Sequence, residues 1–234
     1  MSEDRDSTAV EWPDEPPTPA CNILEFTKRH WEACEPSYKM LAKRLRVLAY
    51  KTPRLSVDAC SGGVYGEIQS GSRCMAWCPP QVDLFSNIFP FFARRGIGMM
   101  LPQTLGHRMI DLGSTMEGAW ILWSERFYHK DDSVHYDIVQ GGSGMFARLP
   151  SAVHWAYLLA RFISLQEDGA DDMSSGYSFP SRTRSELRFI RTSTHLMEGV
   201  VIGMAYLPGE AVYFDAFSID APPCNLVTVD AFLL

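Results

Sequence analysis

The feature that most constrains the fold is a long helical segment followed by a series of strand-like runs. Residues 151–166 spread apolar side chains over a broad surface of a helix, with Ser151 as the expected N-cap and Gly169 as the expected end. Runs with the composition of strands follow at 187–191, 199–207, 211–218 and 226–234. The pattern predicts an α+β fold with a mostly antiparallel sheet and one long buried helix at about 151–166.

The first half of the chain predicts further elements. Asn22 can cap a helix that ends near Cys34, and Pro36 can open a second helix that continues to about Tyr50. A buried helix is predicted within residues 80–95, where Pro90 would bend or end it. Strands punctuated by glycine turns are predicted at 55–58, 64–68, 74–77, 119–123 and 134–139.

The acidic residues are concentrated at the N-terminus. Residues 1–20 carry six acids, one arginine and several prolines, so they hold −5 of the total charge of −7 and leave the rest of the chain near neutral. This segment has too little apolar surface to offset its ordering entropy, and we expect a disordered tail. Residues 21–234 are expected to form a single globular domain, with a mobile loop at about 167–185 that is rich in serine, glycine and acids.

The composition places the chain among soluble intracellular proteins. Its start is acidic and proline-rich, unlike a secretory signal, and its longest uncharged apolar stretch is about half of the roughly 20 residues that a membrane helix needs. We therefore expect a cytoplasmic or nuclear protein with reduced thiols and no membrane partner. No cofactor motif is complete, and no cofactor is expected.

One segment stands out by its positive charge. Residues 38–54 contain six cations and no acid, and these cations are Lys39, Lys43, Arg44, Arg46, Lys51 and Arg54. On a helix over residues 37–50, Lys39, Lys43 and Arg46 share one face, while leucines at 41, 45 and 48 share another. The segment is our predicted binding surface for a protein with an acidic patch. Nucleic acid is the less favoured partner, because only Tyr38 and Tyr50 could stack on bases.

The cysteines offer two catalytic or metal alternatives. Residues Leu55 to Gly63 resemble the nucleophile strand of caspase-like cysteine peptidases, which implies Cys60 as the nucleophile of a cysteine hydrolase. The family also needs a histidine upstream, and His30 is the sole histidine before Cys60. A zinc site is the second alternative, and its ligands would be Cys60, Cys74, Cys78 and His107. Ordinary buried thiols are the simpler interpretation of all three cysteines.

The order of elements between residues 92 and 162 carries a second resemblance. It consists of the run Gly96–Gln103, Gly113, the strand Trp120–Trp123, the strand end Tyr136–Asp137 and the helix start Leu149–Trp155. This order resembles the SUKH superfamily, whose members are bacterial toxin-immunity proteins, eukaryotic regulators and viral antagonists of host responses. The resemblance implies a non-enzymatic protein that binds another macromolecule. We expect that function, with a cysteine hydrolase and a nucleic-acid-binding protein as alternatives.

Overall fold

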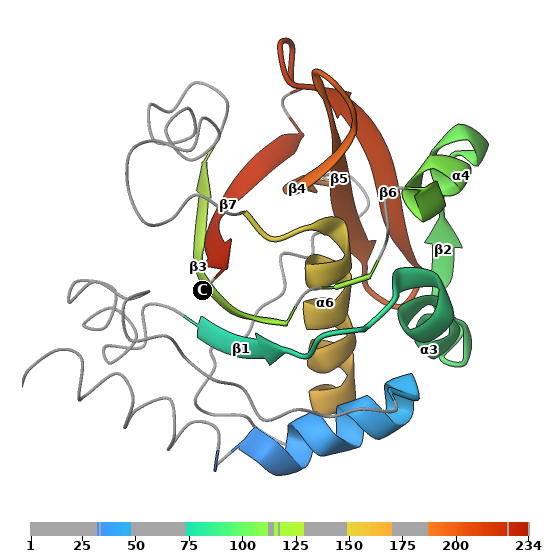
Figure 1. Cartoon of the computed structure of the whole chain (residues 1–234), viewed down its shortest axis with the longest axis vertical. Coiled ribbons are helices and arrows are strands. Elements are labelled where there is room, and N and C mark those ends of the chain that lie inside the picture. Colours follow the sequence, from blue (N-terminus) through green and yellow to red (C-terminus); the bar gives the residue numbers. More distant parts are fainter. Residues whose placement is uncertain are drawn as a thin grey trace, which may run out of the picture.

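The computed structural model describes residues 32, 34–47, 74–111, 115–116, 118–128, 149–169, 187–223 and 225–233. In these residues, strands lie on both sides of one long central helix, α6 (Figure 1). The predicted α+β class with a mostly antiparallel sheet is confirmed. The predicted tail, the predicted strands at 55–58, 64–68 and 134–139, and most of the predicted loop at 167–185 lie outside the described residues.

Seven strands form one sheet in the described part of the chain. They are β1 (Cys74–Cys78), β2 (Gly98–Met100), β3 (Ala119–Tyr128), β4 (Phe189–Met197), β5 (Val200–Leu207), β6 (Ala211–Ser218) and β7 (Leu226–Leu233). Their order across the sheet is β1-β3-β7-β4-β5-β6-β2. Two neighbouring pairs, β4 with β7 and β2 with β6, are parallel, and the other four are antiparallel. The strands predicted at the C-terminal end of the chain are therefore confirmed.

Helix α6 (Ala152–Glu167) forms the centre of the core. Every residue from Ala152 to Leu165 is buried except Phe162, which is partly exposed. The Nδ1 atom of His154 lies 2.6 Å from the Ser151 hydroxyl and 3.3 Å from the Ser151 backbone nitrogen, which fixes the first turn. Gly169 follows the last turn with φ of 60°, a conformation that suits glycine. Both predicted ends of this helix are confirmed.

Shorter helices connect β1, β2 and β3. The predicted helix within 80–95 is present as a π-helical turn, η2 (Leu84–Ile88), continued by α3 (Phe89–Ala93). Asp83 caps η2 by accepting from the backbone N–H groups of residues 85 and 86. Pro90 lies in the first turn of α3, next to the change from the π-helical turn to α-helix. Helix α4 (Gln103–Asp111) has no counterpart in our sequence predictions, since it is short and has few apolar residues.

The basic helix differs from its prediction at both ends. Residues 32 and 34–45 are helical, so Pro36 lies within the helix instead of opening it, and the helix ends at Leu45 rather than near Tyr50. At this end the N–H of Arg46 donates to the carbonyl of Lys43, and the N–H of Val47 donates to the carbonyl of Ala42. This bond pair is a Schellman motif, with Arg46 at the left-handed position that glycine usually occupies.

Replacing Arg46 with glycine is expected to raise the free energy of unfolding. Arg46 has φ of 59°, and an L-residue in that region costs roughly 1–3 kcal/mol, while glycine costs about 0.5–1 kcal/mol more chain entropy. We expect a net gain of about 0.5–1 kcal/mol in urea denaturation. Arg46→Ala is the control, because alanine removes the same charge but keeps the strain. Equal stability of the two variants would contradict the prediction.

The two faces of the sheet differ in what covers them. Side chains such as Ile202, Met204 and Phe214 face α6 and belong to the main core. A second apolar cluster, formed by Phe189, Val201, Ala205 and Leu226, lies on the opposite face of strands β4, β5 and β7. No helix of the described residues has the length and apolar character needed to cross a membrane.

Candidate functional site

The helix over residues 34–45 separates charged from apolar side chains. Tyr38, Leu41 and Leu45 are at most 1% exposed and face the core. Lys39, Lys43 and Arg46 are exposed, which agrees with the face that the spacing predicts. The helix therefore holds these three cations on a surface whose back is fixed in the core.

Arg44, a member of the predicted binding set, points elsewhere. Its guanidinium donates to both carboxylate oxygens of Asp168, at 2.5 and 3.1 Å, and to the carbonyl and hydroxyl oxygens of Ser164. These acceptors belong to the last turn of α6 and its C-cap, where a helix dipole favours a cation. Arg44 thus joins the basic helix to α6 and is engaged within the protein.

Two further arginines approach the same region from α3. The Nη2 atom of exposed Arg94 donates to the carbonyl of Arg44 at 2.7 Å, so Arg94 reaches the end of the basic helix. Arg95 forms a bidentate pair with Glu167 at 2.6 and 2.7 Å and stacks on the ring of Phe91. We call the exposed cations Lys39, Lys43, Arg46 and Arg94 the basic ridge. Arg94 was not among the predicted binding residues. The sequence shows that it follows a predicted helix, but its approach to residue 44 depends on tertiary structure.

Among the described residues, one acid pairs with a cation of the basic ridge. The Nζ atom of Lys39 lies 3.1 Å from a carboxylate oxygen of Glu35, one helical turn earlier, and the Lys39 side chain remains 62% exposed. Met40, in the same helix, is an exposed large apolar side chain at 45%. The predicted cations Lys51 and Arg54 lie outside the described residues. The described surface therefore combines positive charge with one flexible apolar contact.

Beneath the basic ridge, Tyr38 anchors the helix to the sheet. Its hydroxyl accepts a hydrogen bond of 2.9 Å from the backbone N–H of Trp77 in β1, and the guanidinium of Arg161 lies 4.7 Å from its ring centre. Complete burial raises the pKa of Tyr38 to about 12, although Arg161 and the Trp77 bond act in the opposite direction. The phenol is therefore held neutral and acts as a structural group.

The cysteines that the structure describes do not form a metal centre. Cys74 and Cys78 lie on one face of β1, but they are four positions apart on an extended strand, which separates their Cα atoms by about 13 Å, so they cannot share one zinc ion. His107 lies on exposed α4, far from β1 in Figure 1. Burial raises the pKa of the Cys78 thiol well above its usual value. No group of three potential ligands occurs among the described residues.

The cysteine-hydrolase alternative is not tested by this geometry. Cys60 and His30 both lie outside the described residues. Of the described histidines, His154 is buried in the cap of α6, while His107 and His195 are exposed. No family model, curated protein or solved structure matches the chain. Of the predicted sites, the basic helix with Lys39, Lys43, Arg44 and Arg46 is thus the one for which the described residues provide geometry.

Proposed function

We propose that this protein is a non-enzymatic binding module whose basic ridge docks on an acidic surface of a partner protein. The observation that carries the proposal is the exposure of Lys39, Lys43 and Arg46 on a helix whose other face is almost completely buried. A ridge of like charge attracts an acidic surface over about 8 Å at physiological ionic strength and accelerates encounter.

The fixed position of the helix supports this role. The buried Tyr38 and the paired Arg44 hold it from two sides, against β1 and against the end of α6. A surface that is already ordered loses little conformational entropy when a partner binds. The backbone under the ridge is therefore preorganised, and only the ends of its long side chains remain to be ordered.

A protein partner is favoured over nucleic acid by two features of the helix. Tyr38, one of the two aromatic residues that could have stacked on bases, is fully buried. Met40 instead offers an adaptable apolar contact, a property that suits protein interfaces. The resemblance to the SUKH superfamily supports the same class of function, namely immunity, regulation or antagonism through binding. A cysteine hydrolase with Cys60 as its nucleophile is the alternative.

Charge reversal at the ridge tests the proposal. The full chain carrying Lys39→Glu and Lys43→Glu should bind a fluorescent polyglutamate 20-mer at least about tenfold more weakly, as measured by anisotropy at 50 mM salt. Its melting temperature should change little, because exposed charges contribute about 0–1 kcal/mol to folding. Binding by the unmodified protein should weaken as salt rises.

The matched control reverses two distant arginines. Arg108→Glu with Arg188→Glu changes the net charge by the same −4 but lies on α4 and before β4. We expect this control to keep most of the polyglutamate affinity. Equal losses in both variants would mean that only net charge matters, and the ridge would not be the site. Tighter binding of an oligothymidine of equal charge, lost in the ridge variant alone, would favour nucleic acid instead.

A further inference from the structure

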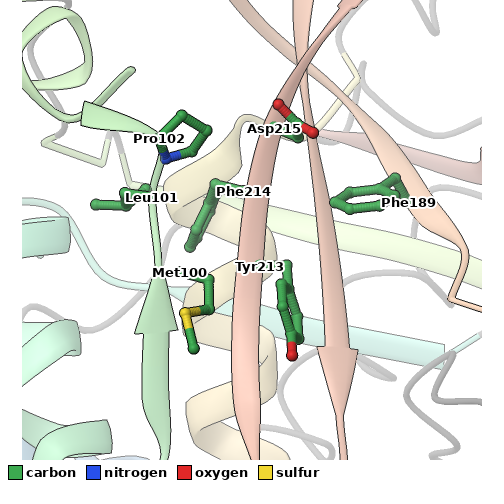
Figure 2. Close-up of a pocket in the computed structure, with 7 residues that line it drawn as sticks. All are labelled: Met100, Leu101, Pro102, Phe189, Tyr213, Phe214 and Asp215. Carbon is green, nitrogen blue, oxygen red and sulfur yellow. The ribbon is translucent and has the colours of Figure 1, made fainter. Parts of the chain in front are cut away.

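A hollow of about 270 Å³ lies on the sheet at the point where β2 leaves β6 (Figure 2). It is lined by Met100, Leu101, Pro102, Phe189, Tyr213, Phe214 and Asp215. Figure 2 shows three of these residues in succession along β6, three where β2 ends, and Phe189 beyond them on the other side. The lining residues include three aromatic residues, one methionine, one carboxylate and no cation.

The hollow exists because β2 is short. Met100 pairs with Tyr213 at the end of the parallel ladder, and two residues later Pro102, which has no N–H to donate, leads into α4. Beside Phe214 and Asp215, β6 therefore has no β2 residue paired with it. The ring of Phe214 is 1% exposed because it faces α6, whereas Met100 is 51% exposed at the edge of the hollow.

A small residue on β5 widens the space. Ala205 pairs with Tyr213, and the pairing of Ile190 with Met204 brings Phe189 beside Ala205 on its other side. The two rings thus flank an alanine in one row across three strands, on the face of the sheet away from α6. The Phe189 ring is 8% exposed and lies 5.0 Å from the ring of Phe217, so partly exposed Tyr213 supplies most of the aromatic surface that faces the hollow.

The carboxylate of Asp215 supplies the only charge in the lining. It is exposed, and its Oδ1 atom accepts 2.8 Å from the backbone N–H of Ala216. Arg191, which is 5% exposed, lies in the same cross-strand row with Gly203 between them, and no ion pair joins Arg191 to Asp215. The negative charge of Asp215 is therefore available to a ligand.

These groups select an alkylated cation. Aromatic faces attract cations, and a single carboxylate adds to that attraction. A primary ammonium brings three N–H donors, whereas the hollow offers only Asp215 and the Tyr213 hydroxyl as side-chain acceptors. A methylated ammonium has fewer donors to satisfy and more apolar surface to bury. The volume lies below the roughly 300–1,000 Å³ of sites for drug-sized ligands, so it suits one side chain.

We propose that this hollow binds a methylated lysine side chain of a partner protein. The site is independent of the basic ridge and takes the opposite charge. It would allow the protein to recognise a modified basic segment with the sheet while the ridge engages an acidic surface.

Methyl NMR of the full chain with labelled methionines tests the proposal. The probes are N-acetyl-trimethyl-lysine amide, the unmethylated lysine compound, and a neutral analogue with a tert-butyl group in place of the ammonium. We expect the trimethyl compound to shift the Met100 methyl signal, assigned with Met100→Leu, and to bind at least about fivefold more tightly than either other probe. If the tert-butyl analogue binds as tightly as the trimethyl compound, the hollow recognises only apolar surface and the proposal is overturned.

Two conservative variants localise the effect. Asp215→Asn keeps the shape but removes the charge, and Tyr213→Leu keeps an apolar side chain but removes the ring. Each variant should bind the trimethyl-lysine probe about three- to tenfold more weakly, while its methionine methyl spectrum remains that of a folded protein. Unchanged affinity in both variants would overturn the proposal.

Two further measurements distinguish a methyl-lysine site from an effect of the ridge and from a lipid site. The Lys39→Glu, Lys43→Glu variant should bind the trimethyl-lysine probe normally, so failure of the ridge and failure of the hollow are distinguishable. Cosedimentation with phosphatidylcholine vesicles that depends on Tyr213 and Asp215 would assign the hollow to a lipid headgroup and overturn the protein assignment.

Discussion

Leu159→Ala is expected to lower the free energy of unfolding by about 3–5 kcal/mol, a large fraction of the stability of an ordinary domain. Leu159 is fully buried at the middle of α6, which is surrounded by core residues on nearly all sides. Because β-strands and other helices enclose this position, the structure can collapse little around the missing atoms. Urea denaturation followed by tryptophan fluorescence measures the loss.

Phe162→Ala is the matched comparison in the same helix. Helical spacing places Phe162 on the apolar surface, but it is the one residue between 152 and 165 that stays partly exposed. Its removal should therefore cost clearly less than the roughly 3–5 kcal/mol of a phenylalanine in a closed core. A loss at Phe162 equal to that at Leu159 would mean that the ring is enclosed in solution.

Alkaline pH is expected to destabilise the protein through Tyr38. The folded pKa of Tyr38 is about 12, above its ordinary value of 10.0, because burial disfavours the phenolate. Below pH 10 the tyrosine is neutral in both states and has no effect. Between about pH 10 and 12 the unfolded chain loses this proton first, so stability falls by on the order of 2–3 kcal/mol. Cys78, whose pKa burial also raises, adds a fall in the same direction.

Tyr38→Phe isolates this contribution. At neutral pH the variant should be less stable by about 1–3 kcal/mol, because the buried N–H of Trp77 loses its acceptor. Its stability should fall less steeply above pH 10, so its curve should approach that of the unmodified protein. Tyr213→Phe, at a partly exposed position, serves as the control. Parallel curves for the Tyr38 variant and the unmodified protein would contradict the assignment.

Local sequence patterns predicted the helices and strands better than they predicted which strands pair. The long apolar surface with Ser151 before it and Gly169 after it predicted α6, and strand composition predicted β4 to β7. The order of strands was not predictable, because the parallel pairing of β4 with β7 joins segments that the sequence spaces widely. The predicted end of the basic helix was wrong because Arg46 adopts a left-handed conformation, which is uncommon for arginine and could not be expected from its residue type.

The candidate site was predictable to a similar degree. Helical spacing identified Lys39, Lys43 and Arg46 as one exposed face, because amphipathicity is a local property. It could not show that Arg44, adjacent to Lys43, turns towards Asp168, which lies 124 positions later. The hollow was beyond prediction for the same reason, since its lining comes from three separate segments of the chain.

The bond between Tyr38 and Trp77 also has a consequence for association between molecules. Strand β1 ends the sheet in the described part of the chain, and all five of its residues are buried and mostly apolar. A terminal strand of this kind is a template for pairing with a strand from another copy. The basic helix occupies the N–H of Trp77 on that side and covers it with Tyr38. Detachment of the helix would uncover an apolar strand edge, so we expect its docking to limit aggregation as well as to present the basic ridge.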